Sequence, residues 1–246
     1  MNNIIEVKGL KKVYGNKTAV DEISFSIKEN TLFSLLGVNG AGKTTTIKML
    51  TGLAKPTCGD AVVCGKSITE NIDEVKKMVN VSTQETSVAP NLTVRENLMF
   101  IAGIYGMGRE EAAARTKEMI EKFNLEEVES SRAKTLSGGW QRKLSIAMAL
   151  VTDPEILFLD EPTLGLDVLA RRDLWKLIAG LKKEKTIIMT THYMEEAEEL
   201  SDEIAVMIDG RIRAIGTLEE LKKLTGKDSL EDAFVEIAEK ESEVVK

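Results

Sequence analysis

Residues 37–44 constrain this chain more than any other stretch. They read G-V-N-G-A-G-K-T, which matches the phosphate-binding loop pattern G-x-x-x-x-G-K-[S/T]. The apolar run Thr31–Leu36 before them predicts a short buried strand. Ile47, Leu50 and Leu53 after them predict the buried face of a helix. A strand that enters such a loop and a helix that leaves it form the context in which the pattern binds phosphate. The chain is therefore expected to be an α/β protein with an anion site at this loop.

The residue types in the loop suit an anion. Gly37, Gly40 and Gly42 allow the backbone to turn with its amides facing inward, where a Cβ would obstruct it. The N-terminus of the following helix adds positive potential. Lys43 would reach the β- and γ-phosphates of a nucleotide, and the Thr44 hydroxyl would hold Mg²⁺. A glycine-rich turn that binds nothing is the alternative, and the flanking strand and helix argue against it.

Composition narrows the class of protein. Apolar residues make up 43% of the 246 residues, ample for a core, and the length allows one α/β domain or two small ones. No apolar run approaches the roughly 18 residues that span a bilayer, and the start M-N-N-I-I-E does not resemble a signal peptide, so we expect a cytoplasmic chain. Cys58 and Cys64 are expected to be free thiols. The formal net charge of −7 argues against nucleic-acid binding, which needs a basic surface.

Candidate catalytic groups end two further apolar runs. Ile156–Leu159 predicts a buried strand that delivers Asp160 and Glu161 at its carboxyl end. Thr186–Thr190 predicts another, which ends close to His192, the only histidine in the chain. Because ligands of open α/β sheets bind outside the carboxyl ends of strands, these groups are expected to face the glycine-rich loop. Asp160 fits an Mg²⁺ site, Glu161 fits positioning an attacking water, and His192 could contact the γ-phosphate or that water. A solvated acidic turn and an ordinary core or surface histidine are the alternatives.

Two other positions could contact a nucleotide. Ser137-Gly138-Gly139 opens a predicted helix with an apolar inner face, so it is a second possible phosphate site, or a simple cap and turn. Tyr14 precedes the Gly15-Asn16 turn between two predicted strands. Its ring could stack on an adenine, or it could be a half-buried strand residue.

The remaining pattern alternates strands and helices around a helical insertion over about residues 86–152. A capping box at Thr93 and Glu96 starts one helix there, and Glu110–Phe123 predicts the next, with Ala114 among its candidate buried positions. Residues 4–29, 61–63 and 78–82 predict strands, and residues 203–208 and 211–215 predict a hairpin. The tail after residue 224 predicts an amphipathic helix that packs on its own domain, with a partner contact as the alternative.

With these residues placed, the chain resembles the ATP-binding subunit of ATP-binding-cassette (ABC) transporters over roughly residues 4–220. Its motifs occur in the family's order: the adenine-stacking aromatic at Tyr14, Walker A at Gly37–Thr45, the loop glutamine at Gln84, the signature at Leu136–Gly139, Walker B at Ile156–Asp160, the catalytic carboxylate at Glu161, the D-loop at Leu166-Asp167 and the switch histidine at His192. Val38 stands where the family often has proline or serine, and Trp140 replaces the usual signature glutamine. The signature is the most specific motif, because many enzymes share Walker A and B without it.

The resemblance implies an α/β fold: a P-loop NTPase (RecA-like) core with an antiparallel β subdomain and an inserted α-helical subdomain. It implies an ATP-binding domain over residues 1–223 and a helical tail over residues 224–246. ATP and Mg²⁺ are the implied cofactors. Lys43, Glu161 and His192 are the implied catalytic residues, and Thr44, Gln84 and Asp160 the implied metal ligands. The implied nucleotide-binding residues are Tyr14, Gly37, Asn39, Gly40, Ala41, Gly42, Lys43, Thr44, Thr45, Gln84, Ser137, Gly138, Gly139 and Asp167.

The resemblance also implies how such a chain works. The signature of one subunit completes the ATP site of another, so a homodimer or heterodimer that closes on ATP is expected to drive a separately encoded transmembrane permease from the cytoplasmic face of the membrane. The tail Ser229–Ile237 looks like the exporter branch typified by drug, sodium and lipid systems. A soluble ABC-type ATPase that acts on nucleic acid or the ribosome is the alternative function. A non-hydrolysing scaffold is disfavoured, because Glu161 and His192 are both present.

Overall fold

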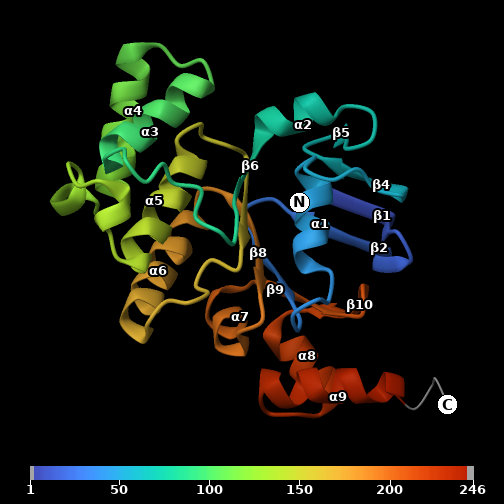
Figure 1. Cartoon of the computed structure of the whole chain (residues 1–246). Helices are drawn as coiled ribbons and strands as arrows, with labels where there is room; N and C mark the ends of the chain where they lie inside the picture. Colours follow the sequence, from blue (N-terminus) through green and yellow to red (C-terminus); the bar gives the residue numbers. More distant parts are fainter. Residues whose placement is uncertain (1–2, 243–246) are drawn as a thin grey trace.

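A computed structural model describes residues 3–242, which form two sheets flanked by helices (Figure 1). The smaller sheet is antiparallel, in the order β2-β1-β4-β5. Its strands are β1 (Asn3–Tyr14), β2 (Lys17–Lys28), β4 (Cys58–Val63) and β5 (Lys66–Ser67). The larger sheet has the order β10-β9-β3-β8-β7-β6. Its strands are β3 (Leu32–Leu36), β6 (Val79–Ser82), β7 (Ile156–Asp160), β8 (Thr186–Thr191), β9 (Glu203–Ile208) and β10 (Arg211–Gly216).

The register of the larger sheet positions the candidate site. Its strands are parallel apart from β10, and β3, β7 and β8 are buried along their whole length, as continuous apolar runs in a covered parallel sheet should be. Leu36 pairs with Thr191, and Asp160 pairs with Thr190. The carboxyl ends of these three strands are therefore level, so the residues that follow them meet at one edge of the sheet.

Helices cover the larger sheet and form the insertion. The insertion holds α3 (Val94–Ile104), α4 (Arg109–Lys122), two short 3₁₀ turns (Glu126–Val128 and Ala133–Thr135) and α5 (Gly138–Leu150). In Figure 1, α3 and α4 lie together at the outer side of α5. The predicted capping box at Thr93 and Glu96 is confirmed. The other helices before the tail are α1 (Lys43–Leu50), α2 (Ile72–Met78), α6 (Val168–Leu181) and α7 (Met194–Leu200). The predicted fold class, an α/β core with an antiparallel sheet and a helical insertion, is confirmed.

The tail helix is part of the core. After α8 (Leu218–Thr225), α9 (Leu230–Ser242) buries Leu230, Phe234 and Ile237 in a cluster with residues of β3, β9 and α7. The amide of Leu230 also donates to Glu198 Oε1 on α7, at 3.1 Å. The expectation that the tail packs on its own domain is confirmed for Leu230–Ile237. The last four residues of the predicted tail lie outside the described range, and the proposed boundary near residue 223 stays a prediction.

Two predicted core positions are wrong. Leu53 is 59% exposed, because α1 ends at Leu50 and Gly52 adopts a positive φ of 71° that turns the chain. Ala114 is exposed and Ala112 is buried on that helix instead, whereas the other candidate positions, Ile120 and Phe123, are buried as expected. Within residues 3–242, every helix is too short or too polar to cross a lipid bilayer.

Candidate functional site

The loop between β3 and α1 requires glycine at three positions. A Cβ on Gly37 would lie 2.2 Å from the carbonyl oxygen of Met207, and one on Gly42 would lie 2.5 Å from that of Ala19. Gly40 and Gly42 have φ angles of 85° and 108°, in the region that favours glycine. The loop is thus pressed against two neighbouring strands, and its backbone can pass only without side chains.

Lys43 is the first residue of α1, and its side chain is almost fully buried. Its ammonium donates to the carbonyls of Gly37 at 2.7 Å and Val38 at 3.1 Å, so it lies over the start of the loop. It is also 3.4 Å from Glu161 Oε1. Burial lowers the pKa of Lys43, while Glu161 and Asp160 oppose that shift by favouring the charged form. The loop therefore holds a desolvated positive charge where an anion would bind.

Thr190 contacts both acidic residues at the end of β7, through the carboxylate of Asp160 and the backbone amide of Glu161. Asp160 Oδ1 accepts from Thr44 Oγ1 at 3.0 Å and from Thr190 Oγ1 at 2.6 Å. The amide of Glu161 donates to the carbonyl of Thr190 at 3.1 Å and to its hydroxyl at 3.0 Å. Glu161 itself has a φ of 47°, a left-handed conformation that costs energy in a residue with a Cβ. Thr190 was not predicted as a site residue, because nothing in the sequence links it to β7.

His192 approaches Glu161 from the next strand. Its Nδ1 lies 3.3 Å from Glu161 Oε2, and the imidazole is 25% exposed. That nitrogen has no hydrogen-bond partner among residues 3–242. The ring packs on Tyr193, with 4.2 Å between the ring centroids. The guanidinium of Arg171, from α6, lies 4.5 Å from the centroid of the Tyr193 ring. Glu161 therefore lies between a lysine and a histidine, as a group that orients a water molecule for attack would.

Most predicted nucleotide-binding residues line one cleft of about 410 Å³. That volume is in the range of sites for small ligands and cofactors. The lining residues are Tyr14, Lys17, Ala19, Asn39, Gly40, Ala41, Gly42, Lys43, Thr44, Thr45, Gln84, Glu161 and Leu164. Tyr14 is about half exposed at the cleft, with Lys12 Nζ 4.8 Å from its ring centroid. Asp160 and His192 lie behind the lining residues, in contact with Thr44 and Glu161 respectively.

The signature residues lie elsewhere in this chain. Ser137 is the N-cap of α5, and it lines a separate cavity of about 320 Å³ with Trp140, Leu169 and others. Gly138 and Gly139 start α5 beside the first turn of α6. Asp167 caps α6 by accepting from the amides of residues 169 and 170. The structure thus brings the Walker residues together and leaves Ser137, Gly138, Gly139 and Asp167 outside their cleft.

A buried acid that the sequence reasoning missed supports this region. Glu196 of α7 is fully buried, and its Oε1 accepts from Thr163 Oγ1 at 2.8 Å and from Trp175 Nε1 at 3.1 Å. Burial raises the pKa of Glu196. It joins the helix after His192 to the turn after Glu161. No local pattern identifies it, because its partners lie 21 and 33 residues away.

The donor set beside the loop fits Mg²⁺. Thr44 offers a hydroxyl, Gln84 an amide oxygen and Asp160 a carboxylate, and all are the hard oxygen ligands that this ion prefers. Residues 3–242 contain no group of three or more His, Cys, Asp or Glu side chains that could hold a metal by themselves. The set Thr44, Gln84 and Asp160 supplies one carboxylate, which suits an ion shared with substrate phosphates.

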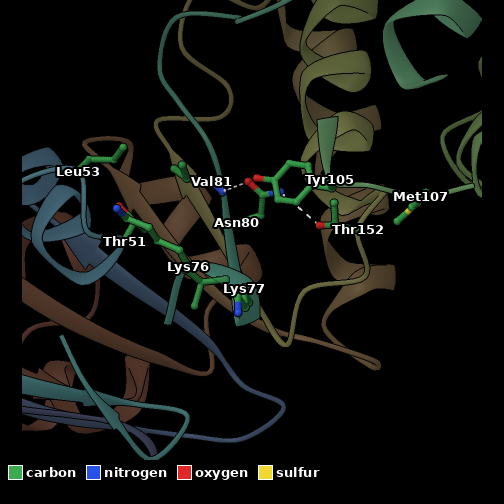
Figure 2. Close-up of a pocket in the computed structure, with 10 residues that line it drawn as sticks. Thr51, Leu53, Lys76, Lys77, Asn80, Val81, Tyr105, Met107 and Thr152 are labelled. Carbon is green, nitrogen blue, oxygen red and sulfur yellow. Dashed lines mark hydrogen bonds between the residues drawn. The ribbon is translucent and has the colours of Figure 1, made fainter. Parts of the chain in front are cut away.

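A larger cavity, of about 570 Å³, lies between the end of α1, β6 and α3 (Figure 2). It is lined by Thr51, Leu53, Lys76, Lys77, Val79, Asn80, Val81, Tyr105, Met107 and Thr152. In Figure 2, the Tyr105 ring lies close to Asn80, whose side chain contacts Thr152 and the Val81 amide. Its described lining contains none of the predicted site residues.

Comparisons with known proteins agree with this geometry. Residues 20–164 match the family described as "ABC transporter". The chain is 41% identical over 226 residues to human "Phospholipid-transporting ATPase ABCA3", covering 90% of this chain and 13% of that protein. It is 43% identical over 213 residues to "Nod factor export ATP-binding protein I" of Burkholderia orbicola (strain AU 1054), covering 86% of this chain and 70% of that protein. It is 40% identical to "Daunorubicin/doxorubicin resistance ATP-binding protein DrrA" of Streptomyces peucetius, covering 92% and 69%.

Solved structures show the same likeness. "Structure of ATP binding subunit of ABC transporter" matches with a TM-score of 0.84 and 29% identity, covering 96% of this chain and 99% of that one. The post-hydrolysis dimer of "the ATP-binding cassette MJ0796 bound to ADP and Pi" matches with a TM-score of 0.78 and 28% identity, covering 87% and 98%. The chain thus spans nearly all of these two solved chains, but its match covers only 13% of human ABCA3.

Proposed function

The chain belongs to the ABC transporter family, and we propose that it is the ATP-hydrolysing motor subunit of a membrane exporter. The observation that carries the proposal is the arrangement at the carboxyl edge of the sheet. A glycine loop, the buried Lys43 and Glu161 line one cleft of suitable volume, and Asp160 contacts Thr44 directly behind that lining. This arrangement supports hydrolysis as well as binding, because it combines an anion cradle with a carboxylate that could act on water.

Each residue in the cleft then has a role toward ATP. The loop amides and Lys43 would hold the β- and γ-phosphates, and Tyr14 would stack on adenine. Glu161 would position and polarise the attacking water, and His192 would contact the γ-phosphate or that water. Mg²⁺, held by Thr44, Gln84 and Asp160, would offset the negative charge of the phosphates when bound.

We further propose that the working unit is a pair of such chains, identical or different. Ser137 and Gly139 line a cavity outside their own chain's Walker cleft, and Gly138 lies between them at the start of α5. Beside that cavity, Val168 and Leu169 are 64% and 80% exposed, an unusual exposure for two adjacent apolar residues. In a head-to-tail pair, these groups and Asp167 would meet the ATP held by the other chain. A two-fold symmetric interface would form two such composite ATP sites.

The permease is proposed to dock where the insertion meets the core sheet. The 570 Å³ cavity there opens beside exposed apolar side chains, namely Leu53, Phe100, Ile104 and Tyr105. Its floor is β6, and Gln84 follows that strand by two residues. A segment of the permease seated in this cavity would therefore sense the loop that carries Gln84. Docking there would place the chain on the cytoplasmic face of the membrane.

Export is proposed from the relatives and from the tail. Two relatives, of which the match covers 70% and 69%, are described as acting in Nod factor export and in drug resistance. The amphipathic sequence Ser229–Ile237 supports the same branch. We propose that residues 1–223 form the ATP-binding domain and residues 224–246 its helical tail. An ATPase that acts on nucleic acid is not favoured, since the matched relatives are transporter subunits.

The test is the variant Glu161→Gln, with Glu195→Gln as its control. Glu195 is an exposed acid on α7, so its variant makes the same chemical change outside the cleft. The Glu161 variant should bind ATP, lose most hydrolysis and elute as a dimer in ATP, while the Glu195 variant behaves as the parent. Hydrolysis at the parent rate in Glu161→Gln would refute the assigned role.

A further inference from the structure

The segment that carries Gln84 is anchored by an arginine from the signature helix. Gln84 itself is exposed at the cleft. Behind it, Arg142 of α5 is only 4% exposed, and its guanidinium donates to the carbonyl of Thr83 at 2.7 Å and to that of Gln84 at 2.5 Å. The two bonds come from the two terminal nitrogens of one fork. The side chain therefore fixes both the position and the direction of the backbone at Gln84.

Such a burial of charge needs a reason. Desolvation lowers the pKa of Arg142, and the nearby carboxylates Asp160 and Glu196 favour its charged form. The same guanidinium thus faces the acid that ends β7 and the carbonyls of the glutamine loop. A buried cation whose direct partners are two loop carbonyls is costly for stability alone, because an apolar residue could fill the same space. That cost is understandable if the loop must be held in one place.

Neighbouring residues on α5 extend this contact. One turn further on, Ser145 Oγ lies 3.0 Å from Ser82 Oγ at the end of β6. Gln141 directly precedes Arg142, and its side-chain amide donates to the carbonyls of Ala133 and Leu136, at 3.1 and 3.3 Å. Residues 141 and 142 therefore hold two different loops from adjacent positions, the one before the signature and the one that carries Gln84.

We propose that Arg142 is a positioning residue that orients Gln84 toward the metal and the γ-phosphate. The inference rests on the proposed role of Gln84 as a metal ligand. Arg142 touches neither ATP nor the metal; it acts through the backbone of residues 83 and 84. Because its helix begins at Ser137, it also ties the Gln84 loop of one ATP site to the signature that serves the other site.

Variants of two arginines test this. Arg142→Met removes both donors, and Arg142→Lys keeps the charge but not the fork. The control is Arg115→Met. Arg115 on α4 also donates to two backbone carbonyls, those of Leu150 and Val151 at the far end of α5, at 3.3 and 3.1 Å. It makes the same type of contact in the same subdomain, away from the cleft.

Three measurements apply to each variant. Amide hydrogen exchange over residues 83–88 reports the order of the loop directly. The Mg²⁺ concentration for half-maximal ATP hydrolysis reports metal positioning. ATP affinity in EDTA, measured by calorimetry, reports the part of the site that does not involve the metal. The same set is repeated for Gln84→Ala and for Gln84→Ala combined with Arg142→Met.

Arg142→Met is expected to raise exchange over residues 83–88 and to raise the half-maximal Mg²⁺ concentration about 10- to 100-fold, as loss of a metal site's supporting group does. The affinity of Arg142→Met for ATP in EDTA should stay within about twofold of the parent. The half-maximal Mg²⁺ concentration of Arg142→Lys should lie between those of the parent and Arg142→Met. In the Gln84→Ala background, Arg142→Met should change nothing further, because groups that act as a unit are not additive. Arg115→Met should lower stability and leave the Mg²⁺ dependence unchanged.

Unchanged exchange and Mg²⁺ dependence in Arg142→Met, or fully additive effects with Gln84→Ala, would overturn the proposal. A parent protein that hydrolyses no ATP would instead refute the proposed function. The exchange experiment would still test whether Arg142 holds the loop.

Discussion

Loss of the Thr190 hydroxyl should test most directly how the two acidic residues at the end of β7 are held. Its hydroxyl donates to Asp160 Oδ1 at 2.6 Å and accepts from the amide of Glu161 at 3.0 Å. Thr190→Val replaces that hydroxyl with a methyl group of nearly the same shape, so packing on β8 is kept and the two hydrogen bonds are lost. Asp160 keeps its bond from Thr44, and the Glu161 amide keeps the Thr190 carbonyl.

The magnitude follows from these contacts. The bond from the Thr190 hydroxyl to the charged Asp160 should contribute about 1.5–3 kcal/mol to the free energy of unfolding. The bond from the Glu161 amide is neutral and is shared with the Thr190 carbonyl, so it should contribute less. We therefore expect Thr190→Val to lower the free energy of unfolding by about 2–3 kcal/mol. For a chain of this size that corresponds to a fall in Tm of roughly 5–10 °C. Because the Asp160 carboxylate and the backbone amide of Glu161 each lose a supporting hydrogen bond, the hydrolysis rate should fall about 10- to 100-fold.

Thr186→Val is the matched control. Thr186 is buried at the other end of β8, and its hydroxyl accepts one bond, from the amide of Asn30 at 2.9 Å. Its loss should cost about 1 kcal/mol and leave the hydrolysis rate unchanged. Both variants are followed by thermal denaturation and by phosphate release at saturating ATP. If Thr190→Val, once shown to be folded, hydrolyses ATP within twofold of the parent, Thr190 does not orient the acids.

Three further outcomes are expected. Lys43→Ala should lose on the order of tenfold or more in ATP affinity or turnover, because a charge-assisted contact to phosphate is removed; unchanged phosphate release would contradict the cradle. Because burial raises the pKa of Glu196, its contribution to stability is full below the ordinary value of 4.5 and is lost as pH rises through the folded pKa, so Glu196→Gln should gain Tm relative to the parent as pH rises above 4.5; a gap that does not change with pH would refute this. Trp140→Gln should lose the contact with Lys143 Nζ, worth about 0.5–1 kcal/mol, and keep hydrolysis within a few-fold; a collapse of ATPase activity would show that the indole is essential.

Local patterns predicted the cleft well because its key residues follow strand ends. Once β3, β8 and β7 lie side by side as parallel strands, the residues after them must meet. The sequence predicted the strands and their shared edge but not their order in the sheet. The helix α8 was missed although its signals were present, a capping box at Thr217 and Glu220 and a positive-φ Gly226 after its end. The error at Leu53 has a similar origin, since Gly52 marked the end of α1.

The supporting residues were beyond sequence reasoning for a different reason. Thr190 meets Asp160 from 30 residues away, and Arg142 meets Thr83 from 59 residues away. A threonine in a buried strand and an arginine in a helix carry no local mark of such partners. Only the packing of α5 on β6 and the register of β7 against β8 reveal them.

The packing of α9 bears on how this unit can be combined with other proteins. The helix closes the core over β9 and binds Glu198, so the ATP-binding unit includes its own tail and needs no outside element to cover that face. A unit with a complete core can be joined to other domains at a surface end without repacking. The match of this chain to 13% of human ABCA3 fits that view. Gene fusion could thus place the same ATP-binding unit in chains of very different length.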